Sequence, residues 1–140
     1  MMKIISIIPA RGGSKGVPRK NVRILNDRPL ISYSILSSIK SNFITRTIVS
    51  SDDEEIIEIA KKYGADVPFV RPVELAQDDI TDYPVFTHCL NWLKNNENYI
   101  PDIIVHLRPT SPFRRTKDID NCIKKLISDG ALVSTPAGST

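Results

Sequence analysis

The sequence predicts an α/β fold in three layers (α/β/α), with helices on both faces of a mostly parallel sheet. Short apolar runs, such as residues 4–8 and 103–107, alternate along the chain with longer segments whose apolar residues recur every three or four positions. Strands that are apolar on both faces are typical of parallel sheets covered by helices on each side. The chain contains no repeat and no linker, so residues 1–140 are expected to form part of one domain.

The first predicted unit runs from a strand at residues 4–8 to a helix at residues 30–40 and a second strand at residues 45–51. Pro29 lies just before the helix, where its fixed φ is tolerated. The apolar residues of the helix recur on one face, and they are Ile31, Ile35, Leu36 and Ile39. Strand, helix and strand in this order form the start of a parallel sheet.

A second helix is expected directly after residue 51. Ser51 and Glu54 are three residues apart, a spacing that predicts a capping box, and Gly64 is expected to end the helix. Its apolar side is formed by Ile56, Ile59, Ala60 and Tyr63. Residues 67–70 then predict a short strand.

The second half of the chain repeats the alternation. A helix is expected at residues 83–95, a strand at 103–107, a helix ended by Gly130, and a last strand at 131–135. The last of these helices is marked by Ile119, Cys122, Ile123 and Leu126. Because an α/β domain ordinarily continues with a helix after such a strand, we expect the protein to be truncated at its C-terminus.

The loop at residues 11–21 combines glycines with positive charges immediately after the first strand. The glycines lack a Cβ, so their backbone can take positive φ and turn successive N–H groups toward one anion. They are Gly12, Gly13 and Gly16, and the polar residues among them are Arg11, Ser14, Lys15, Arg19, Lys20 and Asn21. The loop therefore predicts a phosphate site, and the alternative is a solvated basic turn.

Two common kinds of phosphate loop do not fit this segment. A Walker A loop needs Lys followed by Ser or Thr after its last glycine, whereas Gly16 is followed by Val17 and Pro18. A dinucleotide loop needs a middle glycine where Ser14 stands, and it runs directly into a helix. The loop is therefore expected to hold an anion with its backbone and its cations, as suits a triphosphate.

Four stretches of the chain resemble the acylneuraminate cytidylyltransferases, the CMP-sialic acid synthetase family. They are IPARGGSKGVPRKN at residues 8–21, VSSDDEEI at 49–56, RPVELA at 71–76 and LRPTSPFR at 107–114. The resemblance implies a Rossmann-like nucleotidyltransferase fold and an enzyme that joins CTP to a nonulosonic acid, giving a CMP-sugar and pyrophosphate. Because ligands of such sheets bind at the carboxyl ends of the strands, these loops are expected to converge there.

The resemblance also implies roles for the residues of the first loop. Arg11, Lys20 and Asn21 are expected to be catalytic, with Lys20 and Asn21 nearest the transferred phosphorus. The nucleotide is expected to contact Arg11, Gly12, Gly13, Ser14, Lys15, Lys20 and Asn21. Mg²⁺ is the implied cofactor, held mainly by the CTP phosphates and by residues beyond this chain, and no residue of the chain is assigned to it.

Further nucleotide and sugar contacts are implied in the later loops. Arg71 matches the position that contacts cytosine and ribose, although it could instead stabilise its loop by pairing with Glu74 or Asp78, and Thr81 is a second candidate for the base. The sugar acid is expected to contact Arg108, Thr110, Ser111 and Arg114. Many sialic acid members carry Gln where this chain has Arg108, so a relative such as legionaminic acid is also a candidate substrate.

Two alternative functions stay open at this point. One is a CTP-binding module that is catalytically incomplete, and the other is a cytidylyltransferase for a different sugar acid such as Kdo. The related Kdo enzymes place an acidic motif after the fourth strand, and residues 107–110 contain none. Asp118 and Asp120 form a DxD pattern, but they fall in the first turn of a predicted helix, where acidic residues suit the helix dipole.

Composition and charge are ordinary for a globular protein. The formal net charge of +3 is modest, so we expect no nucleic-acid partner. The apolar run at residues 4–8 is far shorter than the roughly 20 residues of a membrane helix, so we expect no membrane partner. Cys89 and Cys122 are expected to be buried free thiols, and His88 and His106 to have packing roles. We expect a cytoplasmic protein whose full-length form is a homodimer, an arrangement that the family resemblance implies.

Overall fold

The computed structural model describes residues 2–12, 20–77, 82–109 and 115–129. Its main sheet has three parallel strands in the order β4, β1, β5, and β1 (Ile4–Pro9) lies between β4 (Arg46–Ser50) and β5 (Ile103–His106). Ile7 of β1 pairs with Ile48 on one side and with His106 on the other. The parallel sheet is therefore confirmed, and the strand expected at residues 131–135 lies outside the described residues.

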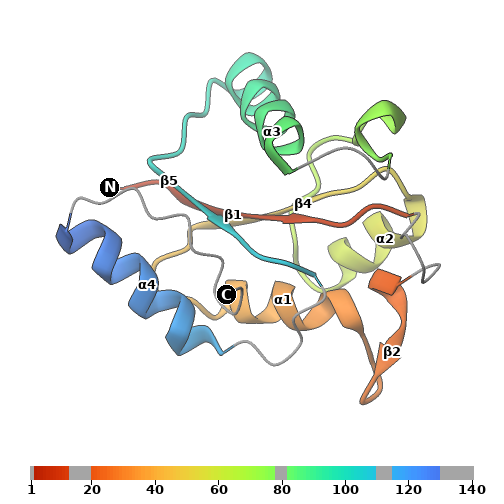
Figure 1. The fold of residues 1–140 in the computed structure, drawn as a ribbon, viewed down its shortest axis with the longest axis horizontal. Coiled ribbons are helices and arrows are strands. Elements are labelled where there is room, and N and C mark those ends of the chain that lie inside the picture. The colour runs from red at the N-terminus through yellow and green to blue at the C-terminus, as the bar shows by residue number, and fades with distance from the viewer. Residues whose placement is uncertain (1, 13–19, 78–81, 110–114, 130–140) are drawn as a thin grey trace.

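Helices cover both faces of this sheet (Figure 1). On one side lies α3, and on the other side lie three helices that contact one another through α1. Their bounds are α1 Leu30–Ile39, α2 Glu54–Lys62, α3 Asp82–Glu97 and α4 Thr116–Asp129. This arrangement confirms the three-layer fold, and the helices begin and end within a few residues of the expected positions.

The alternation of side chains along β1 explains the two layers. Ile5 and Ile7 are fully buried in a cluster with Cys89 and Leu93 of α3. Ile4 and Ile8 point to the opposite face and join a second cluster. That cluster contains Ile31 and Ile35 of α1, Ile56 and Ala60 of α2, and Ile119 and Ile123 of α4. Each isoleucine of β1 thus packs against one of the two helical layers.

Two elements differ from the sequence-based expectation. Residues 67–70 form no strand, because pairing with β4 stops at a single bridge between Asp66 and Ile48 and Pro68 has no N–H to continue it. A small hairpin, β2 (Ile24–Leu25) and β3 (Arg28–Pro29), was not expected. Its turn residues Asn26 and Asp27 have φ of 50° and 69°, which Asn and Asp tolerate better than other side chains. Two short 3₁₀ helices, η1 (Lys20–Val22) and η2 (Val73–Leu75), complete the described elements.

The start of α2 is capped differently from the predicted capping box. The side chain of Asp53, not Ser51, caps the helix by accepting hydrogen bonds from the N–H groups of Glu55 and Ile56. The Ser51 hydroxyl accepts from the Asp53 N–H instead, at 3.1 Å, and so orients the capping residue. Gly64 follows the helix with φ of 101°, which confirms it as the residue that ends α2.

The two cysteines have different environments. Cys89 is fully buried, and the loss of water around it raises the pKa of its thiol to about 12. Cys122 is exposed on α4, so its expected burial is wrong. The apolar spacing of α4 is satisfied by Ile119 and Ile123 without it.

A chain of buried hydroxyl groups joins the centre of the sheet to α1. Ser38 Oγ lies 2.7 Å from Ser6 Oγ of β1 and 2.6 Å from Thr47 Oγ1 of β4. Ser6 and Ser38 are fully buried, and Thr47 is nearly so. The hydroxyl groups therefore satisfy one another inside an otherwise apolar interface.

The hydrogen bonds among Ser6, Ser38 and Thr47 predict that substitutions of these residues have non-additive effects on stability. Ser38→Ala is expected to lower the free energy of unfolding by about 1–3 kcal/mol, because it leaves the Ser6 and Thr47 hydroxyls buried without this partner. The triple variant Ser6→Ala/Ser38→Ala/Thr47→Val removes all three groups together and is expected to cost less than the sum of the single changes. Urea unfolding measures the free energy of unfolding of each variant. Additive losses would contradict the proposed hydrogen bonding among the three hydroxyl groups.

Candidate functional site

The carboxyl ends of all three strands lie at one edge of the sheet, and hydrogen bonds link the segments that follow them. The Ala10 N–H donates to the Ser50 carbonyl at 2.9 Å, and the Leu107 N–H donates to the Ile7 carbonyl at 3.1 Å. The Arg71 N–H donates to the Ser51 carbonyl at 2.8 Å. The structure therefore brings together the ends of the four loops that the sequence singled out, as expected for a ligand site of an open parallel sheet.

Both ends of the loop at residues 11–21 are held by side chains. The Gly12 N–H donates to Asp52 Oδ1 at 2.9 Å, which ties the loop to the end of β4. At the other end, the amide of Asn21 donates to the Arg11 carbonyl at 3.0 Å, and Asn21 is only 4% exposed. The hydrogen bond from Asn21 joins the two ends of the loop at its base, and the bond to Asp52 holds this base at the end of β4.

The remaining predicted residues of this loop are only partly covered by the structure. Lys20 begins η1, directly beside the closed base. Gly13, Ser14 and Lys15 lie outside the described residues, so their predicted contacts with phosphate stay predictions.

Gly12 is required for a reason that the sequence did not indicate. Its φ lies outside the left-handed region, so the positive φ that is open to glycine is not used at this position. A Cβ at Gly12 would lie 2.7 Å from Asp53 Oδ2 and 2.9 Å from Asp53 Cβ. Only glycine therefore lets the loop pass this close to the cap of α2.

Arg71 is buried and its guanidinium is engaged by main-chain and hydroxyl oxygens. It is 3% exposed, and it donates to Ser50 Oγ at 3.0 Å, to the Ser50 carbonyl at 2.6 Å and to the Leu75 carbonyl at 3.4 Å. These contacts join the loop to the end of β4 through Ser50 and to its own 3₁₀ helix through Leu75. Asp78 and the second candidate Thr81 lie outside the described residues.

The two histidines pack against aromatic rings, as expected. His88 of α3 meets the ring of Phe69 edge-on at 4.8 Å, and His106 of β5 meets Phe86 at 4.9 Å. Burial and the positive charge of Arg71 lower the pKa of His88 below its ordinary value. A neutral His88 can therefore share this interior with the buried Arg71.

The loop after β5 is fixed at its main chain. Ser34 of α1 is fully buried and its hydroxyl donates to the Arg108 carbonyl at 2.7 Å, while the Arg108 side chain is exposed. Of the other predicted sugar contacts, Thr110, Ser111 and Arg114 lie outside the described residues.

Several acidic residues of the described chain, including those of the DxD pattern, are engaged in structural contacts. Asp118 pairs with Arg115 at 3.3 Å, and Asp120, only 8% exposed, accepts hydrogen bonds from the Ser41 hydroxyl and the Asn42 N–H. Within the described ranges, no group of three or more metal-ligating side chains comes together. Asp52 and Asp53 are likewise used by the first loop and by the cap of α2.

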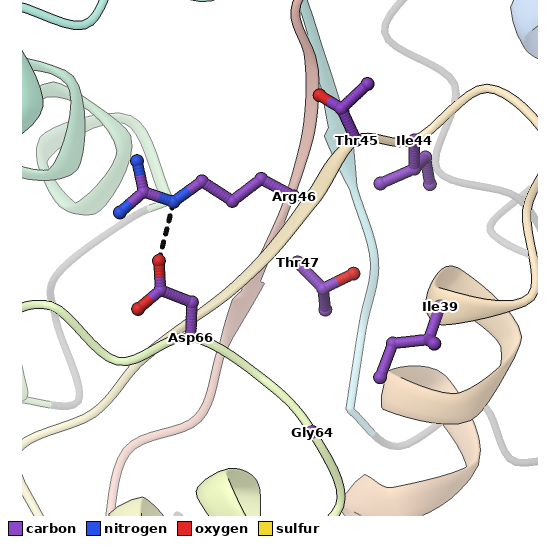
Figure 2. A pocket seen from close by; sticks show the side chains of 7 residues that line it. All are labelled: Ile39, Ile44, Thr45, Arg46, Thr47, Gly64 and Asp66. Atoms are coloured by element: carbon purple, nitrogen blue, oxygen red, sulfur yellow. Dashed lines mark hydrogen bonds and ion pairs between the residues drawn. The ribbon is translucent and has the colours of Figure 1, made fainter.

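A pocket of about 290 Å³ lies at the amino end of β4, away from the edge where the loops meet (Figure 2). Arg46 and Asp66 form an ion pair across it at 2.6 Å, and Arg46 also binds Glu97 at 2.8 Å. The charged side chains that line this pocket are thus paired with one another, and the pocket is separate from the loops of the candidate site. None of the helices in the described part of the chain is both long and apolar enough to cross a bilayer.

Several residues of the site were missed by the sequence analysis. Ser34, Ser50 and Asp52 act through hydrogen bonds to residues that are distant along the chain. Ser50 and Asp52 fall inside a stretch already singled out, next to the carboxyl end of a strand, and this position was the available signal. Ser34 carried no signal, because a serine on a predicted helix face is not distinctive.

The contact between Gly12 and Asp53 predicts a paired effect on stability. Gly12→Ala is expected to lower the free energy of unfolding by about 1–3 kcal/mol, because the new Cβ overlaps Asp53. Asp53→Gly removes the overlapping atoms, and glycine at a helix N-cap costs only a few tenths of a kcal/mol. The double variant should therefore recover most of the loss in chemical unfolding, and no recovery would contradict the contact.

Comparisons with known proteins agree with this arrangement of loops. Residues 5–139 match the family described as cytidylyltransferase. The chain is 41% identical over 128 residues to the pseudaminic acid cytidylyltransferase of Campylobacter jejuni, covering 91% of this chain and 55% of that protein. It is 40% identical over 122 residues to the N-acylneuraminate cytidylyltransferase of Escherichia coli, covering 87% of this chain and 28% of that protein.

The fold also resembles a solved structure of CMP-2-keto-3-deoxy-manno-octonic acid synthetase complexed with CTP. The TM-score is 0.76 at 20% identity, and the match covers 93% of this chain and 49% of that one. The chain thus spans about half the length of the Campylobacter protein and of this synthetase. Since the family match extends over nearly all 140 residues, the chain belongs to the cytidylyltransferase family.

Proposed function

We propose that residues 1–140 are the N-terminal nucleotide-binding part of an enzyme that joins CTP to a nonulosonic acid, giving a CMP-sugar and pyrophosphate. The observation that carries the proposal is the loop at residues 11–21, closed at its base by Gly12–Asp52 and Asn21–Arg11 at the carboxyl edge of the sheet. Membership of the cytidylyltransferase family supports the choice of a cytidine nucleotide.

The proposed chemistry is attack by the anomeric hydroxyl of the sugar on the α-phosphorus of CTP, in line with the departing pyrophosphate. Arg11, Lys15 and Lys20 supply positive charge along the triphosphate, and Lys20 neutralises the charge that develops at the transferred phosphorus. Ser14 adds a neutral donor. Gly12 and Gly13 allow the phosphates to approach the main chain.

The hydrogen bonds of the structure refine two of these roles. The Gly12 N–H is already used by Asp52, so phosphate binding is assigned chiefly to the side-chain cations. The Asn21 amide donates to the Arg11 carbonyl, so its contribution to catalysis is to hold the two ends of the loop, with Arg11 and Lys20, close together. In both roles, hydrogen bonds hold the cationic side chains of the loop in position before the substrate binds.

We assign the nucleoside to the loop that contains Arg71, with Thr81 as a further contact. Arg71 is held at the end of β4 by Ser50, whose own main chain receives the Ala10 N–H of the first loop. The hydrogen bonds of Ser50 therefore couple the position of Arg71 to that of the phosphate loop. A nucleotide whose phosphates lie at residues 11–21 can extend its base toward Arg71.

The sugar acid is assigned to the loop after β5. Arg108 and Arg114 supply positive charge for its carboxylate, and Thr110 and Ser111 supply hydroxyl groups for its polar substituents. The Campylobacter and Escherichia relatives are named as cytidylyltransferases of pseudaminic acid and of N-acylneuraminic acid. We therefore propose a nonulosonic acid as the substrate class, with legionaminic acid as a further member of that class.

Mg²⁺ is the proposed cofactor, bound mainly by the CTP phosphates and by residues beyond this chain. When bound, it would neutralise the charge of the triphosphate. The full-length enzyme is proposed to be a cytoplasmic homodimer, and neither a nucleic acid nor a membrane is part of the proposal.

A second candidate function is a CTP-binding module without turnover. It is favoured by the share of the relatives that the chain spans, since residues of the second half are outside these 140. Titration of CTP, together with an assay of pyrophosphate release, separates the two functions. Binding with release in the presence of a sugar acid supports the enzyme, and binding without release supports the module.

Lys20→Ala tests the assignment of the phosphate loop in the full-length protein. The variant is expected to lose about a hundredfold or more in kcat, because one such cation contributes about 3 kcal/mol to stabilising the transition state. Lys61→Ala is the matched control, since Lys61 is an exposed lysine in the last turn of α2. Near-wild-type turnover of Lys20→Ala, with the fold intact, would remove Lys20 from the mechanism.

A panel of sugar acids tests the substrate class. Pseudaminic, legionaminic and N-acetylneuraminic acids and Kdo are each supplied with CTP, and release of pyrophosphate is measured. We expect one of the three nonulosonic acids to give the highest kcat/KM. The highest kcat/KM for Kdo would replace the proposed substrate class with the alternative sugar acid.

A further inference from the structure

We propose that Ser34 of α1 is a positioning residue for the acceptor sugar, and that it acts by fixing the main chain at Arg108. The inference rests on the proposed function, because it takes the loop after β5 as the sugar side of the site. Ser34 is fully buried and its hydroxyl donates to the Arg108 carbonyl at 2.7 Å, across 74 positions of sequence. It lies on α1, a helix of the layer that is drawn below the sheet in Figure 1.

The main chain around Arg108 is constrained from two directions. Leu107 is fully buried and its N–H donates to the Ile7 carbonyl of β1, so the residue before Arg108 is part of the sheet. The next residue, Pro109, is buried and has a fixed φ. The Ser34 hydroxyl fixes the carbonyl of Arg108, which lies between these two residues. The exposed Arg108 side chain therefore extends from a main chain whose position is fixed.

The same helix also holds the far end of this loop. Thr116, the first residue of α4, donates its hydroxyl to the Ser37 carbonyl at 2.9 Å. Ser34 and Ser37 are three residues apart on α1, about one helical turn. The helix thus sets the separation between Arg108 and Thr116, the two ends of the segment that is proposed to bind the sugar acid.

This geometry predicts an effect that is specific to one substrate. The side chain of Ser34 hydrogen-bonds to Arg108, whereas the side chains that hold the base of the phosphate loop are those of Asp52 and Asn21. Loss of the Ser34 hydroxyl leaves the Arg108 carbonyl without this donor and frees its orientation. The change should therefore weaken binding of the sugar acid and leave binding of CTP almost unaltered.

Ser32 provides a matched control on the same helix. It is also fully buried, and its hydroxyl also donates to a main-chain carbonyl at 2.7 Å, but that carbonyl belongs to Pro29 at the start of α1. Ser32→Ala and Ser34→Ala remove the same atom from equally buried sites. A general loss of helix stability should affect both variants alike, and only the change at Ser34 should reach the sugar loop.

The test measures initial rates of the full-length protein with the sugar acid that gives the highest wild-type kcat/KM, varying each substrate in turn. Ser34→Ala is expected to raise the KM for the sugar acid about tenfold while the KM for CTP stays within about twofold, as expected for loss of one buried hydrogen bond. Ser32→Ala should change neither KM. Equal effects of the two variants, or an equal rise in both KM values for Ser34→Ala, would overturn the inference.

A second variant keeps the inference testable if Ser34→Ala does not fold. Thr116→Val releases the other end of the loop at a half-buried position with little change in volume, and it should raise the KM for the sugar acid in the same direction. An unchanged KM in Thr116→Val would then count against the inference. Failure of the wild-type protein to release pyrophosphate with any sugar acid would instead overturn the proposed function on which the inference rests.

Discussion

The central position of β1 in a parallel sheet is the constraint on which the site depends. Because β1 pairs with β4 on one side and with β5 on the other, all three strands end at the same edge. Ile5 and Ile7 bind it to α3, and Ile4 and Ile8 bind it to the opposite helical layer, so its position is fixed by both cores. Loops from distant parts of the sequence meet at this edge as a consequence of strand order, before any ligand is present.

A second feature of the site is that its loops are held by their ends. Asp52 and Asn21 close the base of the phosphate loop, Ser50 fixes Arg71, and Ser34 fixes the chain at Arg108. In each case a side chain in a buried or partly buried position bonds to a group of another segment. Such contacts place the charged residues in advance, which reduces the reorganisation needed when a triphosphate binds. They also explain why small polar residues accompany the cations of the recognisable motifs.

The sequence predicted the elements whose signals are local and periodic. The apolar strands at residues 4–8 and 103–107, the helices and the end of α2 at Gly64 follow from spacing and from glycine, and the structure confirms them. The strand at 67–70 failed because Pro68 cannot continue a ladder, a constraint that outweighed the apolar composition of the segment. The cap at Asp53 is a local contact to Glu55 and Ile56, and the Ser51–Glu54 spacing assigned it to the wrong residue. The contact that requires Gly12 could not be predicted, because it depends on a distance between segments about forty residues apart. The burial of Arg71 against Ser50 has the same origin.

The central claim is that residues 11–21 form a cationic site for the polyphosphate of a cytidine nucleotide. Calorimetric titration of the protein with CTP and, separately, with cytidine tests it most directly, since the two ligands differ only in the triphosphate. The account predicts that CTP binds at least tenfold more tightly than cytidine and that the difference shrinks as the salt concentration rises. Equal affinities for the two ligands, or the absence of CTP binding, would contradict it.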